Sequence, residues 1–211
     1  GRVSTRLYDA MGRVTQINHA GGLIDYYAYD GAGQQLKHWN NQLGSGDVET
    51  TDYDTQGRII SQRSFGGDIT ANAYAWDASI AITGGLAFGG WLQTTTMANG
   101  RTAQEKTDLF GRMTWKKDLG DHVTTYAYDV AGRMTASTLG STTSTFAYYN
   151  TGQQSSLISL NGTATYSYDA AGNRLTEMLV KSGVTIKNQS ATYDALGRLK
   201  TWAEAGTAIS P

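Results

Sequence analysis

The stretch Tyr-Asp-Val-Ala-Gly-Arg-Met at residues 128–134 determines how the rest of this sequence is interpreted. The same tyrosine, aspartate, glycine and arginine recur at 8–14, 53–59 and 193–199. The arginine is replaced at 29–35 and 168–174, and two further copies, at 107–113 and 148–154, are degenerate. Successive motif glycines are 21, 24, 54, 21, 20, 20 and 25 residues apart. Self-similarity at a fixed period indicates a repeat architecture.

The structural residues of the motif are therefore predicted to be the same few types in each copy. They are Tyr8, Asp9, Gly12, Arg13, Tyr29, Asp30, Gly33, Tyr53, Asp54, Gly57, Arg58, Asp108, Gly111, Arg112, Tyr128, Asp129, Gly132, Arg133, Tyr148, Gly152, Tyr168, Asp169, Gly172, Tyr193, Asp194, Gly197 and Arg198.

A second set of glycines lies about halfway between the motif copies. The segments between glycines are rich in Thr, Tyr, Val and Ile and lack helical spacing, which favours strands. Aromatic residues before the motif turns are spaced i, i+2, as in Tyr126 and Tyr128, so they share one face of a strand. We therefore expect an all-β fold without helices, built of antiparallel hairpin repeats of about 20 residues, with roughly 16 to 18 strands. The half-period glycines are Gly22, Gly46, Gly67, Gly100, Gly120, Gly140, Gly162 and Gly183.

Each residue type in the motif has a physical reason. Glycine at the fifth position allows a positive φ angle and closes a turn. Aspartate at the second position accepts a hydrogen bond from the backbone N–H two residues further on. The tyrosine is expected to stack on the tyrosine of the neighbouring hairpin. The arginine is expected to pair with the aspartate of an adjacent repeat.

The interval of 54 residues between Gly57 and Gly111 is about two repeats long. We interpret Trp76-Asp77-Ala78 as the eroded copy inside it. Residues 77–99 form a degenerate, Gly-rich and apolar segment, which we expect to contain strands whose turn motif is eroded rather than a plugging loop. Residues 1–211 are predicted to be a single repeat array. Gly1-Arg2-Val3 resembles the end of a further copy upstream, so we expect the chain to be a fragment.

Composition excludes several classes of protein. Lysine and arginine number 17 against 18 acidic residues, and a net charge of −1 argues against nucleic-acid binding, which depends on neutralising phosphates. No cysteine is present, so disulfides, Cys-ligated zinc, Fe–S clusters and a Cys nucleophile are excluded. No apolar run approaches the roughly 20 residues of a membrane helix, and no membrane span is expected.

The pattern Tyr-Asp-x-x-Gly-Arg-hydrophobic, at about 20-residue spacing over almost the whole chain, resembles the YD repeat of the rearrangement-hotspot (Rhs) family. That family is related to the C components of insecticidal toxin complexes and to the teneurins. The resemblance implies a long, spiralling antiparallel sheet that forms part of a shell or barrel, and a shell of this kind encloses a toxic C-terminal domain. The chain has no Asp-Pro dipeptide, so the self-cleavage site that usually ends such shells has no counterpart here.

Residues of catalytic or binding types occur, but in no pattern that identifies chemistry. His19, His38 and His122 lie in different repeats, and solvated or stacked histidines are favoured over a metal or triad role. The motif aspartates suit turn capping better than calcium binding, because the calcium β-roll needs Gly-rich nonapeptides. Exposed tryptophans bind sugars by stacking, but packing on neighbouring repeats is favoured. The tryptophans considered are Trp39, Trp91, Trp115 and Trp202.

The sequence thus predicts a non-enzymatic structural segment without cofactor or metal, part of a shell that sequesters a toxin or effector domain. Its expected partners are the remaining repeats of the parent shell and the enclosed domain. The expected localisation is secretion or the cell surface of a bacterium. The alternative is a cell-surface adhesin, or a carbohydrate-binding or self-assembling module that associates through its sheet edges.

Overall fold

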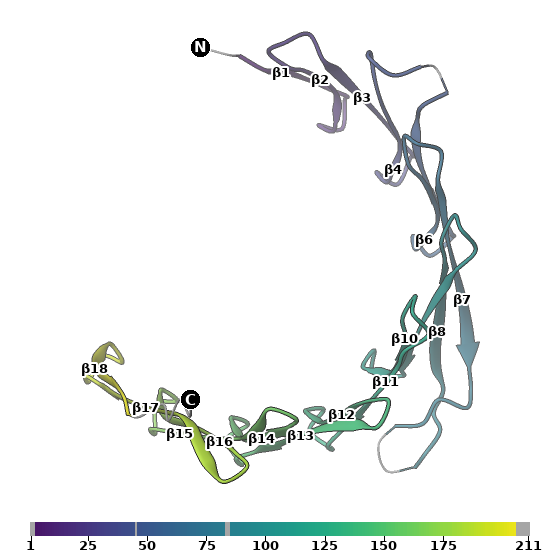
Figure 1. Ribbon diagram of the computed structural model, residues 1–211. Coiled ribbons are helices and arrows are strands. Elements are labelled where there is room, and N and C mark those ends of the chain that lie inside the picture. Colours follow the sequence, from purple (N-terminus) through teal and green to yellow (C-terminus); the bar gives the residue numbers. More distant parts are fainter. Residues whose placement is uncertain (1–2, 45, 83–84, 206–211) are drawn as a thin grey trace. The chain divides into compact units, whose positions relative to one another are not determined.

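The computed structural model describes residues 3–44, 46–82 and 85–205. The upstream copy proposed at Gly1-Arg2-Val3, and Thr83-Gly84 of the degenerate segment, fall wholly or partly outside these residues. Within the described residues every regular element is a strand, and none is a helix (Figure 1). No helix there is long and apolar enough to cross a membrane.

The described residues form 18 strands in an antiparallel sheet, and the registers from β1 to β7 and from β10 to β18 show each strand paired with its successor in the sequence. The all-β, antiparallel hairpin prediction is confirmed. The strands are β1 (Thr5–Tyr8), β2 (Val14–Asn18), β3 (Ile24–Tyr29), β4 (Gln35–Asn40), β5 (Glu49–Tyr53), β6 (Ile59–Arg63), β7 (Ile69–Asp77), β8 (Gly90–Thr96), β9 (Thr102–Asp108), β10 (Met113–Lys117), β11 (Val123–Tyr128), β12 (Met134–Leu139), β13 (Thr142–Tyr148), β14 (Gln154–Ser159), β15 (Gly162–Tyr168), β16 (Arg174–Lys181), β17 (Val184–Tyr193) and β18 (Leu199–Glu204).

Two compact units divide these strands. The first consists of Gly1–Asp77, Trp91–Lys106 and Asp118–Asp121, and it holds β1 to β8 with most of β9. The second consists of Ala78–Gly90, Thr107–Lys117 and His122–Pro211, and it holds β10 to β18. The prediction of a single array over residues 1–211 stays a prediction.

Motif copies lie where an odd-numbered strand leads into the next even-numbered strand, an end of the strands that we call the motif end. In the copy at 8–14, the N–H of Asp9 donates to the carbonyl of Arg13 over 2.9 Å, and the N–H of Gly12 donates to the carbonyl of Asp9 over 3.0 Å. Gly12 has φ +77°. A three-residue loop closed in this way, with its last residue left-handed, requires glycine at that position.

A β-bulge follows each motif turn whose register is given. Tyr128 pairs with Met134, and the preceding Ala127 pairs with Ala136, so Thr135 is an extra residue on the even-numbered strand. The same shift occurs at six further copies. A bulge bends its strand and increases the local twist. Because it recurs with the motif turn, it is a regular structural feature of the repeat, like the turn glycine. The motif pattern did not predict it.

The turns at the opposite end of the strands differ from one another. Ser64–Asp68 and Met97–Arg101 have the three-residue geometry of the motif turns without the motif residues. In the second unit, two-residue turns join Leu139 to Thr142 and Lys181 to Val184. Both residues of the second of these, Ser182 and Gly183, have positive φ, as a type I′ turn requires.

The connection between β7 and β8 is where the repeat pattern fails. The described residues 78–82 and 85–89 belong to no named strand; among them Ala81 and Ala87 form an isolated antiparallel bridge, and the N–H of Ile82 donates to the carbonyl of Leu86 over 2.9 Å. The sequence predicted strands with an eroded turn over 77–99. In the described residues after Asp77 such a turn and the strand β8 are present, but the pairing beside the turn is a single bridge. The connection from Ile82 to Leu86 keeps both hydrogen bonds of the three-residue turn, with Gly85 at φ +90°, although it lacks the aspartate and arginine of the motif.

Few side chains in the described residues are fully buried. The buried apolar ones are Ile80 and Ala164, and the buried charged one is Asp108. Most strand residues are half-buried, because a sheet of one layer covers neither of its faces. Hydrogen bonds and contacts between neighbouring strands therefore carry a larger share of the stability than a core does.

Candidate functional site

The motif end of the strands holds a repeated joint that links each hairpin to the next. Its first part lies within one copy. The Asp9 carboxylate accepts hydrogen bonds from the N–H groups of Met11 and Arg13, both over 2.9 Å, and from Arg13 Nε over 2.7 Å. The predicted bond to the N–H two residues on is confirmed, and the arginine fixes the remaining carboxylate oxygen.

The second part of the joint reaches the next copy. Arg13 Nη1 donates to the carbonyl of Asp30 over 2.8 Å, and the guanidinium lies 4.9 Å from the centre of the Tyr29 ring. The hydroxyl of Tyr29 donates back to the carbonyl of Val14 over 2.8 Å. Two hydrogen bonds to main-chain carbonyls and a cation–π contact thus join hairpin to hairpin.

The same contacts recur along both units. The arginine lies over the next tyrosine ring in four copies, at 4.4–5.0 Å, in the pairs Arg13–Tyr29, Arg58–Tyr74, Arg112–Tyr128 and Arg133–Tyr148. The tyrosine hydroxyl donates to the preceding copy over 2.7–3.2 Å in the pairs Tyr29–Val14, Tyr53–Gln35, Tyr74–Ile59, Tyr128–Met113, Tyr148–Met134 and Tyr193–Arg174.

These contacts perturb the ionisation of the motif residues. The backbone N–H of Arg133 holds the pKa of Asp129 below its usual value, with the Arg133 side chain adding to the effect, and the equivalent bonds act on Asp9, Asp54 and Asp194. For Asp169 the first cause of a lowered pKa is the side-chain hydrogen bond from Asn173. Burial raises the pKa of Tyr128 and Tyr168. The joint therefore keeps its acids ionised and its phenols neutral.

Copies that depart from the motif retain part of the joint. Gln34 and Gln153 occupy the arginine position, and each donates its side-chain N–H to the carbonyl of the next motif glycine, Gly57 or Gly172, over 3.2 Å. Tyr149 replaces the aspartate and donates to the Tyr166 carbonyl over 2.9 Å. Contact between repeats through the main chain thus survives the loss of charge.

Two expectations about the motif are wrong in detail. The arginine pairs with the aspartate of its own copy and not with that of an adjacent repeat, because the three-residue loop places positions 2 and 6 opposite each other. The tyrosine of a motif copy was expected to stack on the tyrosine of the neighbouring hairpin. Its ring instead packs against the arginine guanidinium of the preceding copy. A contact between aromatic rings of successive copies occurs at the degenerate copy, where Tyr149 meets Tyr168 edge to face at 6.2 Å.

The eroded copy is also shifted from the position read in the sequence. Tyr74, and not Trp76, donates its hydroxyl to the Ile59 carbonyl and lies under Arg58. Trp76 lies beyond this position and contacts Trp91 edge to face at 5.5 Å. Tyr74 and Trp76 both lie at positions where a motif aromatic residue could stand. The aspartate that follows Trp76 resembled the Tyr-Asp pair of the motif and led to the choice of Trp76.

The copy at 107–113 holds the most buried ion pair. The Asp108 side chain is inaccessible to solvent, and its Oδ2 lies 2.6 Å from Arg112 Nη2. Gly90 packs directly on this strand, so closely that a Cβ there would lie 1.9 Å from the Thr107 carbonyl oxygen. Thr107 replaces the tyrosine in this copy, and the joint keeps its other members.

The remaining candidates do not assemble into one site. Trp39, Trp91, Trp115 and Trp202 lie on β4, β8, β10 and β18, which are not neighbouring strands, so they form no continuous track. The described residues contain no group of three or more His, Cys, Asp or Glu side chains arranged to hold a metal ion.

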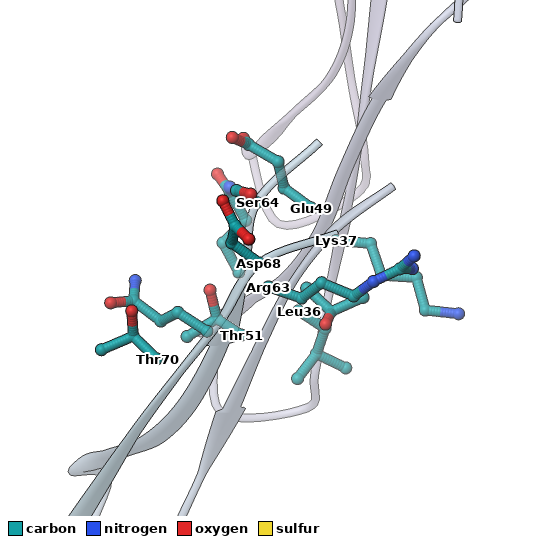
Figure 2. Close-up of a pocket in the computed structure, with 11 residues that line it drawn as sticks. Leu36, Lys37, Glu49, Thr51, Arg63, Ser64, Asp68 and Thr70 are labelled. Carbon is teal, nitrogen blue, oxygen red and sulfur yellow. The ribbon is translucent and has the colours of Figure 1, made fainter. Parts of the chain in front are cut away.

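A shallow polar groove of about 420 Å³ runs across β4 to β7. Figure 2 shows Glu49, Ser64 and Asp68 on one side of these strands, and Lys37 and Arg63 directed to the other. No sequence pattern indicated this groove, because its residues are of the polar types common in strands.

Comparison with known proteins identifies the fold. No family model and no curated protein sequence matches the chain. Crystal structures of TcdB2-TccC3-Cdc42 and of TcdB2-TccC3 without its hypervariable C-terminal region match 95% of this chain at a TM-score of 0.66, with 15% and 16% identity. A Photorhabdus luminescens Tc holotoxin pore matches the same share at a TM-score of 0.67 and 17% identity.

In each case the chain spans only 11% of the length of the similar chain. At this identity the likeness concerns the fold. The resemblance of the sequence to YD-repeat (Rhs) proteins is thus confirmed at the level of the fold: the chain has the strand repeat found within these toxin-complex chains.

Proposed function

We propose that this chain is a non-enzymatic wall segment of a YD-repeat shell, and that the complete shell encloses a toxin or effector domain of a secreted bacterial protein. The repeated joint at the motif end supports this most strongly. It ties hairpin to hairpin by the same contacts in both units, which suits a long continuous wall. The toxin-complex chains with the same fold, about nine times longer, also support it.

The half-buried character of the sheet supports a wall as well. A one-layer sheet exposes one face to the inside of an enclosure and the other to the outside. Such a wall acts by steric exclusion and needs no catalytic group. The scattered positions of the tryptophans give no support to a carbohydrate-binding track.

The test uses the whole gene product that contains this chain. Its native mass is measured, and it is then exposed to increasing protease. We expect a product several times larger than 22.7 kDa, in which a segment outside the repeats survives protease that degrades the same segment expressed alone. A product of the same mass as this chain, or a segment that is degraded equally in both forms, contradicts the proposal.

A joint variant makes the test specific. Asp129→Ala combined with Arg133→Ala removes the carboxylate and the guanidinium of one joint and is expected to lower the protection of the enclosed segment. Lys181→Ala, at an exposed turn of the opposite end, is the matched control and leaves protection unchanged. Equal protection in the joint variant and the control shows that the joint does not hold the wall.

A further inference from the structure

The pairing of β4 with β5 is the shortest among the successive pairings from β1 to β7. Two register pairs join them, Lys37 with Thr50 and His38 with Glu49, although both strands continue toward the motif end. The corresponding pairings of β2 with β3 and of β6 with β7 have three register pairs each. We call this place the β4–β5 seam, and the polar groove of Figure 2 runs across it.

His38 lies on one of the two rungs of the seam and ties three strands together. Its Nδ1 is 2.9 Å from Glu49 Oε2 on β5, and its Nε2 is 3.2 Å from Asp25 Oδ1 on β3. The other oxygen of Asp25 is 2.8 Å from His19 Nε2, in the turn between β2 and β3. Both ring nitrogens of His38 therefore face carboxylate oxygens.

This arrangement has a consequence for the charge on the ring. A neutral imidazole has one N–H donor and one lone pair, whereas an imidazolium has two donors. Ionised carboxylates accept hydrogen bonds and donate none. Both contacts of His38 are hydrogen bonds only when the ring is protonated, and loss of the proton leaves a lone pair facing a carboxylate oxygen.

The surroundings hold the ring in this position. The Tyr27 ring on β3 stacks on His38 at 4.7 Å, with the two planes 2° apart, and Phe65 meets it edge-on at 5.0 Å. The charged groups on this side are Asp25, Glu49 and Asp68, with His19 beyond Asp25, while Lys37 and Arg63 are directed to the other side (Figure 2). Burial, with the charges of Asp25 and Glu49 adding to it, raises the pKa of Tyr27, so the phenol stays neutral.

We propose that His38 is a pH-sensitive clamp on the β4–β5 seam, closed by the imidazolium and weakened when the ring loses its proton. The clamp is therefore complete in solution acidic enough to protonate the ring, and it is lost in solution alkaline enough to remove that proton. The seam then keeps only its short ladder, and opens before the longer pairings of β2 with β3 and of β6 with β7.

The test measures local opening by hydrogen exchange in the intact chain, at roughly pH 5.5 and pH 8.5, with rates corrected for the intrinsic effect of pH. Protection of the amides of residues 49–51 is expected to fall about tenfold, which corresponds to about 1.4 kcal/mol. Protection in β16 and β17, which share six register pairs, is expected to stay constant. Equal behaviour of the two regions overturns the proposal.

Two variants assign the effect to the clamp. His38→Phe keeps a ring to stack on Tyr27 but has no titrating nitrogen, and Glu49→Gln offers an amide that pairs with either form of the imidazole. Both are expected to fold and to show less than about twofold change in seam protection between the two pH values. A change as large as that of the parent chain in both variants rules out His38 as the cause.

Discussion

Turns reverse the chain at both ends of the strands, yet only the turns of the motif end repeat in sequence. At the motif end, eight turns share a three-residue loop whose N–H to carbonyl bond measures 2.8–3.0 Å. At the opposite end, the connections include three-residue turns, two-residue turns and a longer connection between Asn40 and Glu49, and their residues differ.

The difference shows what a repeat motif encodes. A turn that only reverses the chain needs a left-handed residue, and several sequences supply one. A turn that also bonds to the next hairpin needs particular side chains at fixed positions. The motif therefore records a joint that repeats. Bonds between turns also occur at the opposite end, from Asn41 Nδ2 to the Gly22 carbonyl over 2.9 Å and from Arg63 Nη1 to the Gly46 carbonyl over 3.2 Å, but they come from residue types that do not repeat.

The largest expected effect tests the carboxylates of the motif end together. Asp9, Asp54, Asp129, Asp169 and Asp194 have pKa values lowered from the ordinary 3.8 by their hydrogen bonds. A lowered pKa in the folded chain means that their stabilisation is present above about pH 4 and is lost as the pH falls through the lower folded values.

We therefore expect the melting temperature to fall steeply between roughly pH 4 and pH 2 in thermal unfolding followed by circular dichroism. Asp129→Asn keeps an oxygen for the backbone N–H groups but loses the charge, and it is expected to make this fall shallower. An unchanged slope in the variant means that Asp129 does not contribute to the acid sensitivity.

The next effect concerns the opposite end. Gly162 has φ +117°, and a Cβ there would lie 2.2 Å from the carbonyl oxygen of Val180. In Gly162→Ala the added methyl group must displace the main chain at Val180, and the alanine itself has a strained backbone conformation. We expect the free energy of unfolding in urea to fall by about 3 kcal/mol. Gly31→Ala, where φ is not positive and a Cβ meets nothing within 4 Å, is the control. Equal stability of the two variants would falsify the close packing of Gly162 against the Val180 carbonyl.

A smaller loss is expected at a motif glycine. Gly132 has φ +80°, and its nearest neighbour for a Cβ is Arg112 Nη1 at 3.8 Å. Gly132→Val is expected to cost about 1–2 kcal/mol in the same measurement, from backbone strain without a clash. A cost above that of Gly162→Ala would reverse the comparison between the two ends.

The smallest effect is a gain at the opposite end. Ser182 has φ +50° in a two-residue turn, and asparagine is a preferred residue at that position of a type I′ turn. Ser182→Asn is expected to raise stability by roughly 0.5 kcal/mol, measured as the midpoint of urea unfolding. A lower midpoint would mean that the serine hydroxyl has a role beyond the turn.

The fold could be read from the sequence because the code is local and repeated. Gly132 marks a left-handed turn residue and Asp129 marks a cap, and both properties act within a few residues of the chain. The alternation of Tyr126 and Tyr128 fixed the strand period for the same reason. At each copy the turn glycine, the capping aspartate and the two-residue period of the strand agree, and this agreement predicted the antiparallel hairpins.

The joint itself was harder to predict because its contacts cross between hairpins. The sequence does not show that the carbonyl of Asp30 is within reach of Arg13, or that Thr135 is bulged. The clamp at His38 was missed because Asp25 and Glu49 are distant in sequence, and only the registers of β3, β4 and β5 bring them together.

One property of the joint bears on how such an array can change over time. Its bonds between repeats end on main-chain carbonyls, such as those of Asp30, Val14 and Met134. Every residue has a carbonyl group. To accept these hydrogen bonds, a neighbouring hairpin therefore needs only the same backbone conformation and no acidic or basic side chain of its own. A hairpin can therefore be duplicated, exchanged or lost as a unit without compensating substitutions in the hairpins beside it.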